Sequence, residues 1–230
     1  MNVKEQADGT SDEGKRRVLI VDDHPVFRHG ITALINAESD LVVCGEASSS
    51  PSALEAMRAL QPDVALLDIS LPGTNGIELI KLMKAEKPNL PLLMLSMHDE
   101  SLYALRALRA GALGYVMKAE ALTHVLAALR KVLKNEIYVS PEFSQRLIFQ
   151  AVQSVEGGMG SPVDKLSDRE LEVLEMLGRG LGTKGIASEL HLSVKTIETH
   201  RTALMAKLDL HDVAGLVRYA IRIGLVSPES

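Results

Sequence analysis

Five polar residues in the first half of the chain each end a short run of aliphatic residues. They are Asp22 and Asp23 as a pair, Asp68, Ser96 and Lys118. Aliphatic runs of this length are typical of buried parallel strands. In an open α/β sheet, functional groups collect outside the carboxyl ends of the strands. The sequence therefore predicts one pocket that holds three carboxylates, a hydroxyl group and an ammonium group.

This combination of groups indicates phosphoryl chemistry. Three neighbouring carboxylates raise one another's pKa unless a cation joins them, and Mg²⁺ commonly binds one or two carboxylates together with phosphate oxygens. Lys118 and Ser96 would add a positive charge and a hydrogen bond for an incoming anion. A carboxylate can itself be the nucleophile that receives a phosphoryl group. Each polar residue taken alone could simply end a strand, but the joint set favours a site.

Composition narrows the class of protein. The chain has 230 residues, of which 46% are hydrophobic and 3% aromatic, and its net charge is −5. Few aromatic residues argue against a surface on which single-stranded nucleic acid stacks. The single cysteine, Cys44, excludes an internal disulfide and fits a reducing compartment. We find no apolar stretch long enough for a membrane span and no signal peptide, so we expect a cytoplasmic protein without a membrane partner.

The first part of the chain is expected to form an α/β domain over residues 16–135, after a disordered tail over residues 1–15. Strands and helices alternate in it, which predicts a doubly wound, parallel, five-stranded sheet of the flavodoxin type in the order 2-1-3-4-5. The expected strands lie near 17–22, 41–47, 63–68, 91–96 and 113–117, and the expected helices near 25–37, 51–60, 76–87, 99–110 and 120–134.

A linker over residues 136–162 should be partly helical, because apolar residues recur at helical intervals before a glycine-rich break. Residues 163–230 then predict an all-α domain of four short helices. Ser167 and Glu170 form a capping box for the first helix, and Thr183, Ser193 and Asp212 are expected to cap the others. Gly185 falls inside the second helix, where it is unfavourable.

Two of these helices, joined by a tight turn at His191 and Leu192, have the pattern of a helix-turn-helix. The second helix should turn Ile197, Leu204 and Leu208 toward the core. Its polar residues suit a major groove bounded by phosphates. Candidate DNA contacts are Lys195, Thr196, Glu198, Thr199, His200, Arg201, Thr202 and Lys207. For His200, packing or phosphate contact is favoured over base reading. The domain from Val163 onward has nine Lys or Arg and ten Asp or Glu, so binding has to rely on local arrangement and dimerisation.

The runs Val18–Pro25, Leu67–Gly73 and Gly114–Lys118 resemble the receiver domain of bacterial response regulators, and the second half resembles the helix-turn-helix of the NarL/FixJ (LuxR-type) branch. The resemblance implies that Asp68 accepts a phosphoryl group from a sensor histidine kinase. It implies that Asp23, Asp68 and the backbone carbonyl of Ser70 bind Mg²⁺ directly, and that Asp22 does so through water.

The resemblance also assigns roles around the phosphoryl group and on DNA. Ser96 and Lys118 would grip the phosphoryl oxygens, after which Tyr115 swings inward, while Ser70 and His98 stand where the family tunes the lifetime of the phosphoryl group. Among the DNA contacts, Glu198, Thr199 and Thr202 match base-facing positions, and Lys195, Thr196 and Arg201 match positions that hold the backbone.

The resulting hypothesis is a transcription regulator rather than an enzyme. Phosphorylation would release the second domain, which the unphosphorylated receiver either covers at its recognition helix or keeps from dimerising. Expected partners are a sensor histidine kinase, double-stranded promoter DNA, a second copy of the chain and RNA polymerase. Three alternatives stay open: an aspartate-nucleophile phosphohydrolase, although Ser70 stands where its general acid would be; a pseudo-receiver; and an output domain that binds protein.

Overall fold

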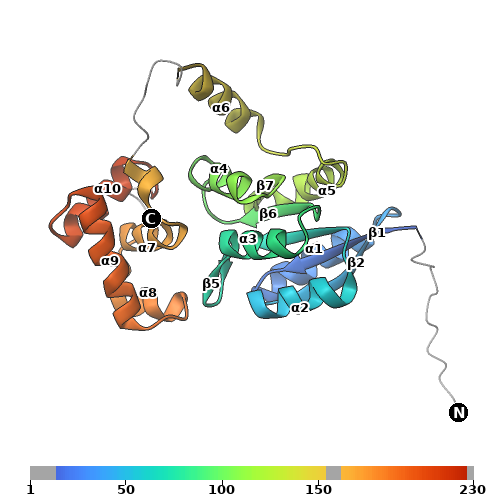
Figure 1. The fold of residues 1–230 in the computed structure, drawn as a ribbon, viewed down its shortest axis with the longest axis horizontal. Helices are drawn as coiled ribbons and strands as arrows, with labels where there is room; N and C mark the ends of the chain where they lie inside the picture. The colour runs from blue at the N-terminus through green and yellow to red at the C-terminus, as the bar shows by residue number, and fades with distance from the viewer. Residues whose placement is uncertain (1–13, 154–161, 227–230) are drawn as a thin grey trace, which may run out of the picture.

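The computed structural model describes residues 14–153 and 162–226. Most of the expected N-terminal tail and the glycine-rich break of the expected linker lie outside the described residues. Two units follow one another along the chain, an α/β unit and a helical unit, with helix α6 between them in sequence (Figure 1).

The first unit is built on a parallel sheet in the order β2-β1-β3-β6-β7, which is the flavodoxin-type order that the sequence predicts. Its central strands are buried on both faces because helices cover both sides, and this is why they contain unbroken aliphatic runs, whereas the edge strand β2 is only partly buried. In β1, for example, Val18 to Val21 are at most 2% exposed. The strands are β1 (Arg16–Val21), β2 (Leu41–Ala47), β3 (Val64–Asp68), β6 (Leu92–Ser96) and β7 (Gly114–Met117).

Five helices cover the sheet in two layers. Helices α1 and α5 supply the buried residues that pack with Val18, Leu66 and Leu93 on one face, and α2, α3 and α4 supply those that pack with Leu19, Leu67 and Met94 on the other. The bounds are α1 (Pro25–Asn36), α2 (Ser50–Leu60), α3 (Gly76–Glu86), α4 (Glu100–Ala110) and α5 (Ala121–Val132), with a short 3₁₀ turn η1 (Lys118–Glu120) before α5.

A small hairpin between β3 and α3 is an addition to the expected pattern. Strands β4 (Ser70–Leu71) and β5 (Thr74–Asn75) pair antiparallel, and Gly73 turns between them with φ of +74°. The hairpin brings the start of α3 back onto the end of β3, where the Gly76 amide donates to Ile69 O at 2.7 Å. A Cβ at Gly76 would lie 2.0 Å from Asp68 O, so only glycine allows this close approach.

The second unit consists of short helices around a central one. After α6 (Pro141–Gln153) and a 3₁₀ turn η3 (Pro162–Lys165), its helices are α7 (Asp168–Gly178), α8 (Thr183–Glu189), α9 (Val194–Leu208) and α10 (Val213–Arg222). The predicted capping box of Ser167 and Glu170 is confirmed, as are the caps from Ser193 and Asp212. The left-handed conformation of His191, with φ of +53°, makes the predicted tight turn.

One expectation about the second helix is wrong. Gly182, not Thr183, is the N-cap of α8, because Thr183 is already helical and its hydroxyl is engaged by Arg201 Nη1 at 2.6 Å. Gly185 lies inside α8 as expected, and a Cβ there would meet only the Leu181 side chain, at 3.9 Å, so close packing does not require a glycine. Nothing in the structure explains the glycine at this position.

Helix α7 is buried from both sides, because α9 and α10 pack on one side of it and the α/β unit lies on the other (Figure 1). One cluster of buried apolar residues runs from the α2–α4 face of the sheet into the helical unit, so the two units share a core. Among residues 14–153 and 162–226, no helix is long and apolar enough to cross a bilayer.

The close approach at Gly76 gives a test of the fold around Asp68. We expect Gly76→Ala to lower the free energy of unfolding by about 3 kcal/mol or more, since the clash is with backbone that cannot rotate away. Chemical denaturation measures the loss. Gly30→Ala is the matched control: Gly30 lies in α1 with nothing within 4 Å of its added Cβ, so this change should stabilise by about 0.5–1 kcal/mol. Equal effects at the two positions would contradict this role of Gly76.

Candidate phosphorylation site and candidate DNA interface

The predicted carboxylates meet at the carboxyl edge of the sheet. Single oxygen or nitrogen atoms of Asp22, Asp23, His24 and Asp68 all lie within 4.8 Å of one another. Asp22 and Asp23 follow the end of β1 and Asp68 ends the neighbouring β3, so the strand order brings them together. Asp22 and Asp68 are each only 2% exposed, so their charges are poorly hydrated.

Lys118 neutralises part of this charge. Its Nζ lies 2.8 Å from Asp22 Oδ2 and 2.6 Å from Asp68 Oδ2, at the end of β7. The ammonium group also lies over the Phe27 ring, 4.8 Å from its centroid, so the aromatic face supports it. The two carboxylates and the charge of Asp23 nearby leave the cluster with more negative than positive charge.

The burial and the excess negative charge of the cluster change the pKa of Asp68. Burial raises the pKa of this carboxyl to about 6, and the charge of Asp22 adds to the rise, although Lys118 acts in the opposite direction. For Lys118, burial acts to lower the pKa, but its two carboxylate partners outweigh burial and raise it. The site therefore holds a charged lysine beside a carboxylate whose ionised form is poorly compensated.

These groups fit a hard divalent cation. The cluster offers several carboxylate oxygens within a few ångströms, as Mg²⁺ requires, and a cation would relieve the repulsion that raises the pKa of Asp68. Ser70 follows two residues after Asp68, and its backbone N–H lies 3.4 Å from Asp68 Oδ1. His24 Nδ1, 2.8 Å from Asp23 Oδ1, belongs to the same cluster, but 62% of its side chain is exposed.

Ser96, at the end of β6, is fully buried beside the cluster. Its hydroxyl accepts a hydrogen bond from the backbone N–H of His98 at 3.0 Å. Tyr115 is also inside: its ring is 1% exposed and its hydroxyl donates to His98 O at 2.8 Å. Tyr115 thus points inward in this structure, and a change of its position on phosphorylation stays a prediction.

A hollow of about 190 Å³ opens above Asp68, and both units line it. The α/β unit contributes Asp23, Asp68 and Lys118 to this hollow. The helical unit contributes Glu172 and Met176 from α7, Arg179 directly after α7, and Glu189 and Leu190 at the end of α8. The second unit therefore forms one wall of the candidate site, which the sequence did not predict.

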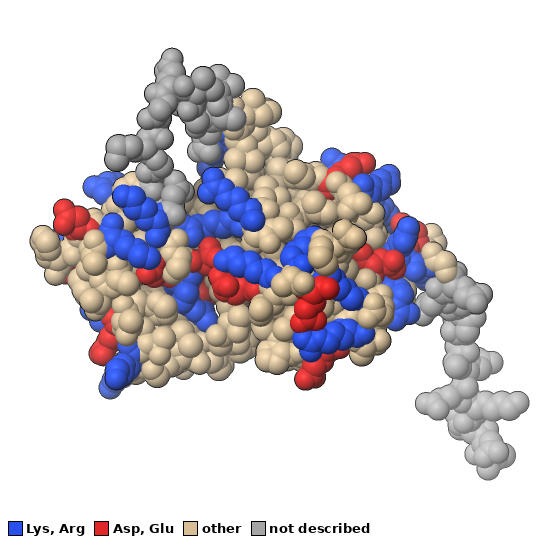
Figure 2. Space-filling model, viewed as in Figure 1, with Lys and Arg blue, Asp and Glu red and all other residues tan. Residues whose placement is uncertain are grey.

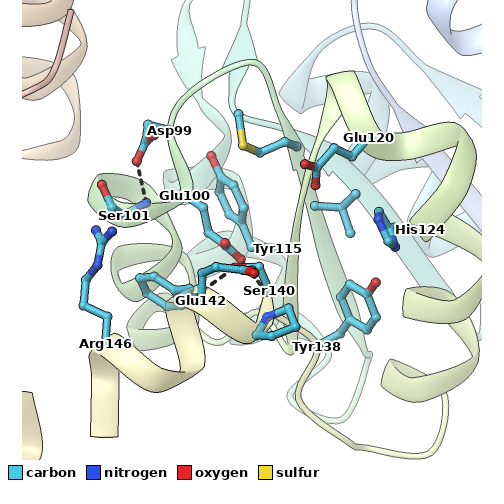
Figure 3. A pocket seen from close by; sticks show the side chains of 14 residues that line it. Asp99, Glu100, Ser101, Tyr115, Glu120, His124, Tyr138, Ser140, Glu142 and Arg146 are labelled. Carbon is cyan, nitrogen blue, oxygen red and sulfur yellow. Dashed lines mark hydrogen bonds between the residues drawn. The ribbon is translucent and has the colours of Figure 1, made fainter. Parts of the chain in front are cut away.

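A larger hollow of about 550 Å³ lies on the other side of Tyr115, between α4, α5 and the start of α6 (Figure 3). Two of its acidic groups have structural partners: Glu100 Oε1 accepts from Ser140 N at 2.8 Å, and Asp99 caps α4 by accepting from Ser101 N. The hollow has no nucleophile beside a base, so we assign no chemistry to it.

Helix α9 presents the expected polar stripe. Lys195, Glu198, Thr199 and Thr202 are exposed, while Ile197 and Leu204 are fully buried beneath them. The hydroxyls of Thr199 and Thr202 donate to the backbone carbonyls four residues earlier, at 3.0 Å each. The α/β unit packs on α7 and α8, so it does not cover this stripe. Two modes of inhibition were expected, and one of them was that the receiver covers the recognition helix. Within residues 14–153 and 162–226, the α/β unit does not cover the exposed stripe of α9.

The remaining candidate DNA contacts are partly engaged inside the helical unit. Arg201 reaches Thr183, and Lys207 Nζ lies 2.6 Å from Glu170 Oε2. His200 and Thr196 are half-buried. Burial lowers the pKa of His200, and the charge of Arg169 on α7 lowers it further, which agrees with a packing role. Basic and acidic side chains are intermingled on the face seen in Figure 2, so no broad positive field appears there.

Three residues near the site escaped the sequence analysis or received only a general role: His24, His98 and Glu175. His24 directly follows the acidic pair, and that adjacency was a usable signal. His98 connects Ser70 to Glu175, which lies 77 residues away, and no local pattern reports a contact of that kind.

The raised pKa predicts an unusual titration. In metal-free protein, we expect the Asp68 carboxyl to titrate near pH 6 by carbon-detected NMR, and Lys118→Met to raise that midpoint further because a positive charge is lost. A proton then binds the folded protein at a pH where the unfolded chain, with a pKa of about 3.9, does not bind it. The contribution of Asp68 to stability should therefore rise as the pH falls from about 7 to about 4. A midpoint near 4 in both proteins would contradict this account.

Comparison with known proteins agrees with this geometry. Residues 18–130 match the response regulator receiver domain, and residues 164–220 match the bacterial regulatory proteins of the luxR family. A putative transcriptional regulator of Pseudomonas aeruginosa is 39% identical over 91% of this chain and 99% of its own length. The oxygen regulatory protein NreC of Staphylococcus haemolyticus is 35% identical over 90% of this chain and 97% of its own length.

Solved structures of a third relative, RcsB, are similar over most of the chain. RcsB of Salmonella enterica serovar Typhimurium, bound to the promoter rprA in the presence of the phosphomimetic BeF₃⁻, has a TM-score of 0.61 and is 29% identical over 89% of this chain and 98% of that one. On its two matched domains and these relatives, the chain belongs to the NarL/FixJ family of two-component response regulators, which join a receiver domain to a LuxR-type helix-turn-helix and regulate transcription.

Proposed function

We propose that this response regulator accepts a phosphoryl group on Asp68 from a sensor histidine kinase and thereby controls its own dimerisation and promoter binding. The observation that carries the proposal is the Lys118 ammonium group, which bridges Asp22 and the poorly compensated Asp68 at the carboxyl edge of the sheet. In this proposal residues 16–135 form the receiver, residues 136–162 the linker and residues 163–230 the DNA-binding domain.

In the proposed reaction, an oxygen of Asp68 attacks the phosphorus of a phosphohistidine on the kinase. A P–O bond forms on Asp68, the P–N bond breaks, and the imidazole that leaves takes up a proton. Mg²⁺, when bound by Asp23, Asp68 and the carbonyl of Ser70, with Asp22 acting through water, would neutralise charge on the transferring group. Lys118 and Ser96 then hold the phosphoryl oxygens by charge and by a hydrogen bond.

The chain in this role is a substrate of phosphoryl transfer and not an enzyme that acts on a separate molecule. The residue two positions after Asp68 supports this, because Ser70 has no carboxyl group that could act as the general acid of an aspartate-nucleophile phosphohydrolase.

For the output, we propose that α9 reads a major groove through Glu198, Thr199 and Thr202 while Lys195, Thr196 and Arg201 hold phosphates, with His200 and Lys207 at the edges. The exposed stripe on α9 and the DNA-bound relative support this assignment. Because the domain is not basic overall, two copies on paired half-sites would supply the affinity that one copy lacks. RNA polymerase would be a further partner, and the proposed place of action is the cytoplasm.

The receiver face that would pair in the dimer is formed by α1 and α5. These helices contact each other, and large hydrophobic side chains project from their first turns: Val26 is 88% exposed and Leu122 is 72% exposed. Exposed apolar groups of this size on adjacent helices suit a second copy of the same face.

Intact mass spectrometry tests the receiver chemistry. After incubation with acetyl phosphate and Mg²⁺, the wild-type chain should gain one phosphoryl group, whereas Asp68→Asn and EDTA-treated wild type should gain none. Asn keeps the shape of the side chain but is a poor nucleophile, so loss of labelling cannot be ascribed to lost packing. An adduct of equal yield on Asp68→Asn would show that another residue is the acceptor.

Binding assays test the DNA interface, with duplexes that the BeF₃⁻-treated protein selects from a random pool. Lys195→Ala should weaken binding to every selected duplex by a similar factor and reduce the salt slope by about one, as expected for a lost phosphate contact. Glu198→Ala should instead reduce the discrimination between bases at one position of the duplex, by about 1–3 kcal/mol of binding free energy.

Arg109→Ala is the matched control for charge, because Arg109 is an exposed cation on α4 in the receiver. It should leave both the affinity and the salt slope unchanged. If Arg109→Ala and Lys195→Ala weakened binding equally, the contact would be a general charge effect and α9 would lose its assigned role.

A further inference from the structure

The wall that the helical domain adds to the phosphorylation pocket is joined to the receiver by a buried chain of hydrogen bonds. Ser70 Oγ lies 2.9 Å from His98 Nε2, and His98 Nδ1 lies 2.7 Å from Glu175 Oε2 on α7. His98 is 5% exposed and Glu175 is 3% exposed, so neither can exchange its partner for water without movement. The chain runs from the second residue after Asp68 to the core of the DNA-binding domain.

The charge of Glu175 determines which atom donates in its hydrogen bond with His98. Burial acts to raise the pKa of Glu175, but the hydrogen bond from His98 and nearby positive charges outweigh it, and the net shift is downward. Glu175 is therefore ionised, and His98 Nδ1 must donate to it. The other ring nitrogen, Nε2, is hydrogen-bonded to the Ser70 hydroxyl, so the imidazole bridges Ser70 and Glu175. Tyr103 also donates to Glu175 Oε2, at 2.9 Å, which completes the carboxylate's shell from the receiver side.

The backbone of His98 is held by the two residues that are proposed to respond to a phosphoryl group. Its N–H donates to Ser96 Oγ at 3.0 Å, and its C=O accepts from the Tyr115 hydroxyl at 2.8 Å. A displacement of Ser96 toward a phosphoryl oxygen therefore shifts the backbone of His98, and with it the ring that contacts Glu175. A ring nitrogen moved by 1 Å from a bond of 2.7 Å no longer makes that bond.

Electrostatic repulsion between a phosphoryl group and the wall formed by the helical domain would also favour release of α7. A phosphoryl group adds about 1.5 to 2 negative charges. On the facing wall, Arg179 is paired with Glu175 and Glu189 is exposed, whereas Glu172 is fully buried and its Oε1 has no hydrogen-bond partner among the described residues. More negative charge beside the buried carboxylate of Glu172 is unfavourable unless the wall moves away.

We propose that His98 is the positioning residue that couples the phosphorylation pocket to the docked DNA-binding domain, through its hydrogen bond to Glu175. The inference rests on the proposed phosphorylation of Asp68. Docking of α7 fixes His98, Ser70 and the Ser96 loop in the arrangement described above, and a phosphoryl group on Asp68 breaks the His98–Glu175 bond and releases α7. Since coupling is reciprocal, docking must oppose phosphorylation by the same factor by which phosphorylation weakens docking.

A second contact between the domains provides the control. Arg106 on α4 donates to Leu166 O at 2.7 Å, to Val163 O at 2.6 Å and to Asp168 Oδ1 at 3.1 Å, and thereby clamps the segment that leads into α7. Arg106 touches none of the residues in the Ser70–His98–Glu175 chain. Arg106→Gln should weaken docking and leave the coupling intact, whereas Glu175→Gln should weaken both.

The experiment is hydrogen exchange of the full chain, read on the amides of α7, with Mg²⁺ alone and with Mg²⁺ plus BeF₃⁻. In wild type, BeF₃⁻ should speed exchange of α7 about fivefold or more, a factor within the usual range of coupling between sites. In Arg106→Gln, exchange should start faster and should still rise on addition of BeF₃⁻. In Glu175→Gln, exchange should start faster and should change little, and labelling by acetyl phosphate should be faster than in wild type.

Ser70→Ala cuts the chain at its other end and leaves the His98–Glu175 bond in place. Because the displacement reaches His98 through Ser96 and not through Ser70, slow exchange of α7 as in wild type, with the response to BeF₃⁻ retained, is the expected result for this variant. The inference is overturned if α7 of wild type ignores BeF₃⁻, or if Glu175→Gln responds to it as fully as Arg106→Gln. Absence of any phosphoryl adduct on wild type from acetyl phosphate would overturn the proposed function itself, which separates the two failures.

Discussion

Repulsion among Asp22, Asp23 and Asp68 is the constraint on which the rest of the structure depends. The strand order places the ends of β1 and β3 side by side, so the carboxylates cannot move apart without unmaking the sheet. Lys118 forms ion pairs with two of them, Asp22 and Asp68. The pKa of Asp68 is still raised to about 6 by burial and by Asp22, so the negative charge of the cluster is only partly neutralised. A site in this condition gains from a divalent cation, and a cation bound there presents positive charge to an incoming phosphoryl group. The same repulsion that costs stability thus prepares the pocket for its ligand.

Helix α7 connects the phosphorylation pocket to the second domain, because it lines the pocket and bonds to His98. Two of its three buried glutamates bond to receiver residues, Glu175 to His98 and Glu172 to Asn75, whereas Glu170 pairs with Lys207 inside the helical unit. Hydrogen-bonded polar groups of this kind make an interface specific in geometry, since a small shift leaves a buried charge without its donor. An interface of the same area made of apolar side chains alone would tolerate such a shift. The polar contacts therefore suit a docked state that a small movement at Ser96 or His98 can undo.

The sequence predicted the elements that local patterns report. The aliphatic runs before Asp22, Asp68, Ser96 and Lys118 located the strands, and the rule for parallel sheets then brought these residues to one edge. The hairpin at 70–75 was missed because two-residue strands carry no periodicity, and the cap of α8 was misplaced because Gly182 and Thr183 are both acceptable N-caps. Glu172 and Glu175 have the i, i+3 spacing of residues on one solvated helix face. Their burial follows from the docking of two domains, and a contact such as that between His98 and Glu175 has no signature in either segment alone.

The docking of α7 on the receiver also explains why the DNA-binding domain has as many acidic as basic side chains: several of its acidic residues bind the receiver. Asp168, Glu172 and Glu175 all lie on α7 and reach receiver residues Arg106, Asn75 and His98 respectively, while the exposed polar stripe lies on α9. Helix α9 packs on the other side of α7, so about one helix diameter, roughly 10 Å, separates the acidic side from the stripe. The Debye length at physiological salt is about 8 Å, so carboxylates exposed by undocking are largely screened from phosphates that meet α9. The acidic groups that hold the domain to the receiver can therefore coexist with DNA binding, and a net count of charges misjudges the surface that DNA meets.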